Sequence, residues 1–290
     1  MPQKTLLRNQ RFSTKSKKMC GRFVQIVNIE LFVTRFGVKK PSEISVKDNF
    51  NLAPGDLAYV ITNDKPGELQ AFQFGLTPKW AKKQMYLINA RSEGDLNKED
   101  DPDYSGDLGI VNKPSFRTSI RSKRCLVIAN GYFEGPKKER LSKPYHIYKK
   151  NEEVFTFAGI WDTWVDNNTG EVVNSFSIIT TTANSVTQEI GHHRSPVILN
   201  KRDETKWLDD SLPMEQVLSL LKPYPGDDFK ADPISIRIKD PKNKSRDLLI
   251  PIDPESSSKY ESSIKKDLKL EGMGRNKRKE DPPNPQGTLF

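Results

Sequence analysis

Cys20 invites a functional interpretation because Met19 stands directly before it. If translation starts at Met19, Cys20 becomes the second residue, and its small side chain favours removal of the initiator methionine. An N-terminal cysteine carries an amine and a thiol on adjacent carbons, and the amine, with a pKa of about 8, is partly neutral at pH 7. Such an amine condenses with an aldehyde to an imine, which the thiol then closes into a thiazolidine ring. The simpler interpretation of Cys20 alone is a small buried cysteine.

Two segments offer side chains that could transfer protons. Glu134 follows an apolar run and closes an aromatic segment, and a carboxylate desolvated among aromatic rings suits a proton shuttle. An exposed glutamate in a turn is the local alternative. His192 and His193 are two of only three histidines, and histidine titrates near neutral pH. Because neighbours on a strand face opposite sides, this pair predicts no metal site. The third, His146, is predicted to be a structural strand residue.

A compact polar cluster occupies residues 89–93. Asn89 and Arg91 are two residues apart, so on an extended segment they face the same side. Asparagine can hydrogen-bond a sugar or base, and arginine can hold a phosphate with two hydrogen bonds. A solvated loop is the local alternative. Four aromatic side chains could stack on the bases of a single strand or fill a core: Phe74, Trp80, Trp161 and Trp164.

These residues need a scaffold, and short apolar or alternating runs predict one that is rich in strands. Strands are predicted at residues 57–62, 125–129, 145–148, 154–161, 176–180, 197–199 and 234–238. Helices are predicted at residues 29–36, 183–190 and 213–221. Because the strands rarely alternate with long helices, we expect a mainly antiparallel α+β domain, not a doubly wound sheet.

Composition excludes several classes of protein. No apolar run approaches the roughly 18 residues of a membrane span. Two cysteines exclude a disulfide scaffold, and with three histidines they are too few for a zinc ribbon. Glycine-rich nucleotide motifs are absent, so no cofactor is predicted. The net charge of +9 over 290 residues is compatible with nucleic acid as a partner.

The ends of the chain differ from its centre. Residues 1–18 hold six basic side chains and no acid, which fits a solvated tail, a mitochondrial presequence or a segment absent if Met19 is the start. Residues 19–253 are predicted to form one catalytic domain. Residues 254–290 are predicted to be a disordered tail with a basic cluster at 275–279. That cluster favours the nucleus, with the mitochondrion as the alternative if the leader is a presequence.

Eight motifs occur in a characteristic order: 19–23 (MCGRF), 51–54 (NLAP), 74–80 (FGLTPKW), 89–93 (NARSE), 124–125 (RC), 131–134 (GYFE), 157–161 (FAGIW) and 192–196 (HHRSP). Together they closely resemble the SRAP family (SOS-response-associated peptidase), whose eukaryotic members are called abasic site processing proteins. The resemblance runs from Met19 to about Ile238. Any one motif is weak, whereas eight in order are highly specific.

The resemblance implies a single domain with a barrel-like core that binds single-stranded DNA and cross-links itself to abasic sites. Cys20 matches the cysteine at which the family's mature chain begins. In the family, the thiol and amine of this cysteine form the thiazolidine with the ring-opened sugar aldehyde. The other catalytic positions match Asn89, Glu134 and His192. Basic residues of the DNA groove match Arg22, Arg91 and Arg194, with Trp80 beside them. We expect a monomer that acts in the DNA damage response.

Two positions depart from the family pattern. Gly135 stands where the family usually carries tryptophan, which we expect to loosen the pocket beside Glu134. Ser195 replaces the usual methionine, with a smaller expected effect. The chain ends in a segment from Gln286 to Phe290 that resembles a shortened motif for binding a sliding clamp. Two other functions stay open: a cysteine peptidase that removes its own leader with His192 as base, and a non-catalytic module that recruits partners to DNA.

Overall fold

We analysed a computed structural model of the chain, which describes residues 21–43 and 45–253. Several predictions fall outside these residues: the basic leader, Cys20 itself, the tail, its basic cluster and the clamp-like segment from Gln286 to Phe290. The described residues up to Pro251 belong to one compact unit. Among the described residues, no helix is both long and apolar enough to cross a membrane.

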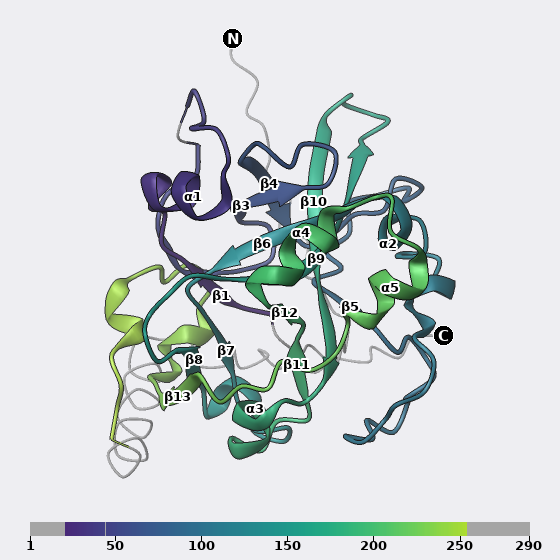
Figure 1. Ribbon diagram of the computed structural model, residues 1–290. Coiled ribbons are helices and arrows are strands. Elements are labelled where there is room, and N and C mark those ends of the chain that lie inside the picture. The colour runs from purple at the N-terminus through teal and green to yellow at the C-terminus, as the bar shows by residue number, and fades with distance from the viewer. Residues whose placement is uncertain (1–20, 44, 254–290) are drawn as a thin grey trace, which may run out of the picture. The chain divides into compact units, whose positions relative to one another are not determined.

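Five strands close into a barrel (Figure 1). They are β3 (Leu57–Thr62), β4 (Gln70–Phe74), β6 (Arg124–Ala129), β9 (Phe155–Val165) and β10 (Val172–Thr182). Pairing runs from β9 to β10, β4, β3 and β6, and β6 returns to β9. Within the described residues only β10 takes parallel partners, namely β4 and the short β5 (Asn89–Arg91). A mainly antiparallel, barrel-like α+β fold is therefore confirmed.

A second sheet lies beside the barrel in the order β13, β8, β7, β1, β2. Its strands are β1 (Phe23–Gln25), β2 (Asn49–Leu52), β7 (Gly131–Glu134), β8 (Tyr145–Lys149) and β13 (Phe229–Pro233). All of its pairs are antiparallel. Two short strands, β11 (Arg194–Pro196) and β12 (Ile198–Leu199), extend the barrel sheet at β10 and β9.

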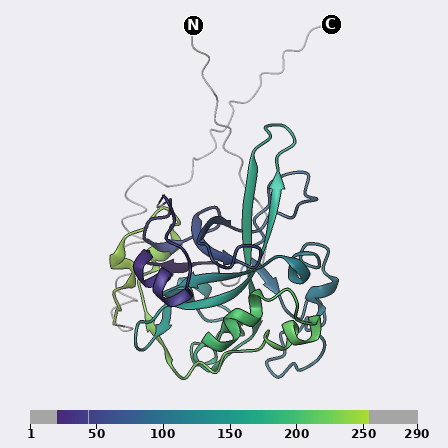
Figure 2. The same ribbon diagram turned by 45° about the horizontal axis from the view of Figure 1, so that its top comes forward.

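Alternation along the strands divides the core into two layers, because successive side chains point to opposite faces. One layer gathers aromatic rings from both sheets, and Phe23 contacts Phe74 and Phe157 edge to face at centroid distances of 5.3 and 6.0 Å. The other layer packs the outer face of the barrel against helices through residues such as Phe32 and Trp207. Figure 2 shows the long hairpin of β9 and β10 (teal) projecting beyond the other strands.

Five α-helices flank the strands in the described part of the chain: α1 (Ile29–Phe36), α2 (Ser119–Ser122), α3 (Ser185–Glu189), α4 (Lys201–Leu208) and α5 (Met214–Ser219). Local chemistry sets the ends of α1, because the Asn28 side chain accepts from the Leu31 amide at its start. Gly37 ends it with φ of 66°, a left-handed conformation that glycine adopts at little cost.

Most predicted elements are present, and the exceptions have physical reasons. Residues 234–238 are wrong as a strand, because the segment overlaps the 3-10 helix η3 (Ile236–Lys239), whose start is capped by the Ser235 side chain. Helix α4 escaped prediction because its sequence is mostly charged. It nevertheless buries Glu204, which pairs with Arg35 at 2.8 Å.

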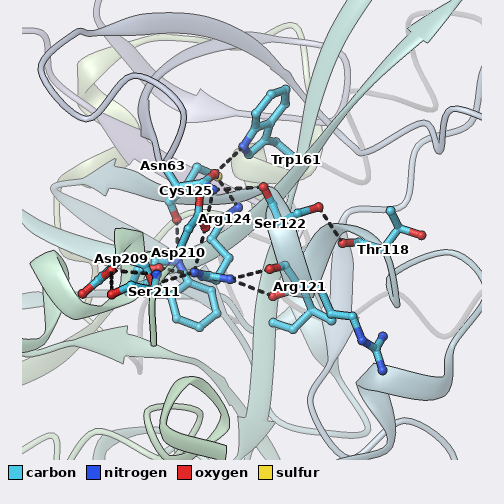
Figure 3. Close-up of polar contacts among 12 residues, drawn as sticks. Asn63, Thr118, Arg121, Ser122, Arg124, Cys125, Trp161, Asp209, Asp210 and Ser211 are labelled. Carbon is cyan, nitrogen blue, oxygen red and sulfur yellow. Dashed lines mark hydrogen bonds and ion pairs between the residues drawn. The ribbon is translucent and has the colours of Figure 1, made fainter. Parts of the chain in front are cut away.

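Arg124 ties two helix ends to the barrel (Figure 3). This residue of β6 is 1% exposed, and its guanidinium donates to the carbonyls of Ile120, Arg121, Trp207 and Asp209 at 2.7–3.2 Å. Asp210 completes the set with an ion pair at 3.0 Å. Burial lowers the pKa of Arg124, and the two nearby aspartates oppose that shift. The carbonyls left open at the ends of α2 and α4 are thereby satisfied.

Candidate active site

Glu134 and His192, which are far apart in sequence, meet in the structure. Glu134 is the last residue of β7 and is 5% exposed. It is therefore a buried carboxylate and not an exposed glutamate in a turn. His192 is 6% exposed and follows α3. Its Nε2 atom lies 3.6 Å from Oε2 of Glu134. A carboxylate and an imidazole at this separation can exchange a proton with each other or through a group placed between them.

The backbone determines which nitrogen of His192 faces the carboxylate. Its Nδ1 atom lies 2.7 Å from the carbonyl oxygen of Gly135, so Nδ1 carries hydrogen and donates there. Nε2 is therefore the atom that can exchange a proton with Glu134. The His192 amide donates to the Thr187 carbonyl at 2.8 Å, and α3 begins with a capping box between Asn184 and Thr187. A capped helix thus orients the histidine.

Gly135 does not loosen the pocket beside Glu134, contrary to the expectation from sequence. A Cβ atom at this position would lie 1.8 Å from the Arg140 carbonyl oxygen and 2.6 Å from that of Lys143. Backbone therefore fills the space that a larger side chain would need. The close approach of these carbonyls requires glycine, and it leaves the Gly135 carbonyl directed at His192.

Arg194 and Arg91 converge on one buried carboxylate, Glu93. Arg194 and Glu93 are each 1% exposed and share two hydrogen bonds of 3.2 and 2.8 Å. Arg194 also donates to the Thr180 hydroxyl at 3.3 Å. Nε of Arg91 lies 3.6 Å from Oε2 of Glu93. In this arrangement Arg194 is an internal ion-pair partner, and its assignment to DNA binding stays a prediction.

The comparisons with known proteins agree with this architecture. The family model described as SOS response associated peptidase (SRAP) matches residues 19–241. The chain belongs to the SRAP family. The motifs in the sequence had predicted this family, and the prediction is confirmed.

Relatives of this SRAP chain come from bacteria and vertebrates. "Abasic site processing protein YoqW" of Bacillus subtilis is 32% identical over 238 residues, which cover 80% of this chain and 99% of YoqW. "Abasic site processing protein HMCES" of Gallus gallus is 29% identical over 211 residues, which cover 64% of this chain and 58% of HMCES. A crystal structure of a protein from Bacteroides thetaiotaomicron aligns with a TM-score of 0.67 at 30% identity, covering 81% of this chain and all of that one.

The other predicted residues of the SRAP site lie on separate elements. Asn89 begins β5, is half-buried and pairs with Ile178 of β10. Arg22 precedes β1, and its guanidinium donates to the Asn51 side chain at 2.8 Å and to the Ile238 carbonyl at 2.9 Å. Burial lowers the pKa of Arg22, against the attraction of nearby aspartates. These contacts join β1, β2 and η3.

Trp80 is the aromatic candidate that remains accessible. Its side chain is 61% exposed, and the indole nitrogen donates to the Pro114 carbonyl at 3.3 Å. The other three aromatic candidates are buried in the core: Phe74, Trp161 and Trp164. For them the core-filling interpretation from the sequence is the one that applies. Trp80 is therefore the member of this group that could stack on a base.

Sequence reasoning missed residues that surround His193. Its Nε2 atom lies 3.4 Å from Oδ2 of Asp100, and Lys137 lies 3.6 Å from the same oxygen. Burial and the neighbouring His192 lower the pKa of His193 to about 4, so it is neutral at pH 7. The signal that could have revealed Asp100 is the run of acidic residues directly after the polar cluster at residues 89–93.

Of the two cysteines, Cys125 lies within the described residues and Cys20 lies outside them. Cys125 is a buried thiol on β6, and desolvation raises its pKa well above the usual value. It is therefore unreactive and structural. Among the described residues, no group of three or more histidine, cysteine or acidic side chains could hold a metal ion.

Proposed function

We propose that this SRAP domain processes abasic sites in single-stranded DNA by forming a covalent thiazolidine cross-link through Cys20. The relatives that align over most of the chain are named abasic site processing proteins, which supports abasic DNA as the target. The observation that carries the chemistry is the buried pair of Glu134 and His192, with 3.6 Å between Nε2 and Oε2. Such a pair supplies the proton transfers that aldehyde condensation needs.

The strand register supports a place for Cys20 beside this pair. Strand β1 is antiparallel to β7, with Phe23 opposite Tyr132 and Val24 opposite Gly131. The Phe133 amide donates to the Arg22 carbonyl at 3.1 Å, so the pairing continues toward the end of β7. Continuing it by one further residue brings position 21 opposite Glu134. Cys20 precedes Gly21 in the sequence, and consecutive Cα atoms are about 3.8 Å apart across a trans peptide bond.

The reaction balances with loss of one water. The neutral amine of Cys20 attacks C1′ of the ring-opened sugar, and the aldehyde oxygen takes up a proton. The carbinolamine then loses its hydroxyl as water to give an imine. The thiol sulfur adds to the imine carbon, and its proton passes to the nitrogen. Glu134 and His192 would donate and accept these protons, and such assistance is typically worth about 10²–10⁴-fold in rate.

The reaction requires Cys20 to be the first residue of the active protein. An amide bond at Cys20 removes the basic amine, so a chain that starts at Met1 could form only a thiol adduct. Intact mass measurement of the protein purified from its native host decides this point. A measured mass that matches a chain beginning at Cys20 supports the proposal. A mass that matches a chain beginning at Met1 contradicts it.

A cross-linking assay tests the chemistry directly. The chain beginning at Cys20 is incubated with single-stranded DNA that carries one abasic site, and a denaturing gel should show a shifted band. Cys20→Ala should abolish the stable band. Cys20→Ser keeps the amine but lacks the thiol, so its adduct should appear only after borohydride reduction of the imine. Cys125→Ala is the matched control and should cross-link normally. A band that survives unchanged in Cys20→Ala would refute the proposal.

A further inference from the structure

An acidic loop lies against the candidate active site. Residues 95–107 contain six acidic side chains and one lysine, a net charge of −5 in a chain whose total is +9. The loop follows β5, which carries Arg91. A strongly negative segment next to a predicted DNA-binding arginine is the opposite of what binding a polyanion favours. Its contacts therefore need an explanation.

Asp100 carries the contacts of the acidic loop. Its Oδ1 atom lies 3.0 Å from Nη1 of Arg91. Its Oδ2 atom lies 3.4 Å from Nε2 of His193 and 3.6 Å from the Lys137 ammonium. The Asp100 side chain is only 14% exposed. One carboxylate thus takes the centre of a cluster made by three nitrogen-bearing side chains from three separate segments.

The carboxylate does not satisfy the groups that surround it. Nε of Arg91 and Nδ1 of His193 are buried and make no hydrogen bond within the described residues. Oδ1 of Asp100 likewise lacks hydrogen-bond geometry, although it lies close to Arg91. Polar atoms buried without a partner are unfavourable, so the Nε–H group of Arg91 is a donor that this cluster leaves unused.

The backbone at Asp100 is also in an uncommon conformation. Its φ is 58°, in the left-handed region that residues other than glycine rarely adopt and that aspartate and asparagine tolerate best. Holding such a conformation costs free energy, which the surrounding contacts must offset. The ion pairs with Arg91 and Lys137 are the contacts positioned to do so.

We propose that Arg91, Lys137 and His193 form a binding site for a phosphate of single-stranded DNA, and that Asp100 occupies this site until DNA displaces it. A phosphodiester carries one negative charge, as the carboxylate does, and arginine binds either group with two hydrogen bonds. The inference rests on the proposed function in requiring single-stranded DNA as the ligand. It adds an internal competitor, which makes the affinity for DNA lower than the charges of Arg91 and Lys137, together with the neutral His193, would give without Asp100.

The site lies next to the groups that would carry out the chemistry. The rings of His192 and His193 are 4.8 Å apart, and the Lys137 amide donates to the Gly191 carbonyl at 3.0 Å. Displacing Asp100 would therefore place a phosphate beside His192. Occupation of the cluster by Asp100 and occupation by DNA are mutually exclusive because both need the same face of Arg91.

The test compares two substitutions that remove the same charge from the same loop. Full-length protein is titrated into a fluorescent single-stranded oligonucleotide without abasic sites, and Kd is measured by anisotropy at low salt. Asp100→Asn should lower Kd about tenfold, because it removes the competing charge beside the phosphate. Asp103→Asn is the matched control: Asp103 is exposed and stands outside the three contacts of Asp100, so Kd should change less than about threefold.

Two further variants keep the result interpretable. Asp100→Gly suits the left-handed backbone and should tighten binding as Asp100→Asn does. Adding Lys137→Gln to Asp100→Asn should reverse part of the gain. The inference is overturned if Asp100→Asn binds no more tightly than Asp103→Asn, whether or not abasic DNA is cross-linked. If the variants rank as expected while the Cys20 chain forms no cross-link, the phosphate site stands and the proposed function fails.

Discussion

Arg194 and Glu93 show that a basic side chain near a candidate active site can serve the fold. Each is 1% exposed, and the two groups share two hydrogen bonds. A buried charge that loses its partner keeps its desolvation penalty without the compensating attraction. For Arg194, the partner inside the protein is thus established, whereas a DNA partner is a prediction.

At this scale we predict that Glu93→Gln lowers the free energy of unfolding by about 3–5 kcal/mol, because the Arg194 charge then lacks its counter-ion. Urea denaturation at pH 7 measures the change. Glu99→Gln, which alters an acidic residue of the nearby loop, should shift stability by less than about 0.5 kcal/mol. Equal effects of the two substitutions would mean that the buried pair contributes no more than a surface charge.

Elements bring the chemical groups to their positions. The end of β7 supplies Glu134 and the Gly135 carbonyl, while α3 supplies the anchor for His192. The segment that contains η2 (Arg140–Ser142) closes over Gly135 so tightly that its backbone occupies the place of a side chain. The orientation of His192 therefore depends on the packing of a loop as well as on its own residues.

We expect Gly135→Ala to slow cross-linking of abasic DNA by about tenfold or more, because the new methyl group must displace the Arg140 backbone and with it the acceptor for His192. The initial rate of band formation on a denaturing gel measures this. Gly67→Ala is the control, since nothing lies within 4 Å of a Cβ atom there. An unchanged rate in Gly135→Ala would show that the Gly135 carbonyl does not position the histidine.

Arg124 supports the elements around the barrel, and its replacement tests how strongly. Arg124→Lys should lower the free energy of unfolding by about 3 kcal/mol, because lysine cannot reach the carbonyls at the ends of α2 and α4 simultaneously. Thermal or urea denaturation gives the value. Arg117→Lys, at an exposed position nearby, should be close to neutral. If both variants retain wild-type stability, the helix ends do not depend on the guanidinium.

On the scale of the whole molecule, two histidines make stability depend on pH. Burial lowers the pKa of His146 to about 4, with Asp232 opposing the shift and Lys230 adding to it. The pKa of His193 is also lowered to about 4. Between pH 6.5 and 4 these two histidines therefore bind more protons in the unfolded chain than in the folded one. Their contribution to the free energy of unfolding falls as the pH falls through this window.

His146 alone should contribute about 3 kcal/mol to this loss, from a shift of roughly two pKa units or more. In His146→Gln, the difference in stability between pH 7 and pH 4 should be smaller than in wild type by about that amount. The variant should also be less stable at pH 7, since it lacks the ring that stacks on Tyr148 at 4.5 Å. Urea denaturation at both pH values provides the comparison, and parallel pH profiles would contradict the prediction.

Local patterns were enough to predict much of the scaffold and the family. Helix α1 lies where a helix was predicted at residues 29–36, and β3 lies where the apolar run at residues 57–62 predicted a strand. The order of the motifs pointed to the SRAP family without any knowledge of the fold. His146 lies on strand β8 and is buried, which agrees with its prediction as a structural strand residue.

Only the tertiary structure decided which charged groups meet. Arginine has the same local signature whether it binds DNA or lies buried against Glu93, because the difference depends on segments that are distant in the chain. The same holds for Asp100: its acidic run marks a charged loop, but the run does not specify that this residue reaches Arg91 and Lys137. The sequence by itself therefore determined the local elements, the family and the candidate chemical groups. Long-range packing decided their pairing and burial, since the free energy of a charge depends on what surrounds it in space.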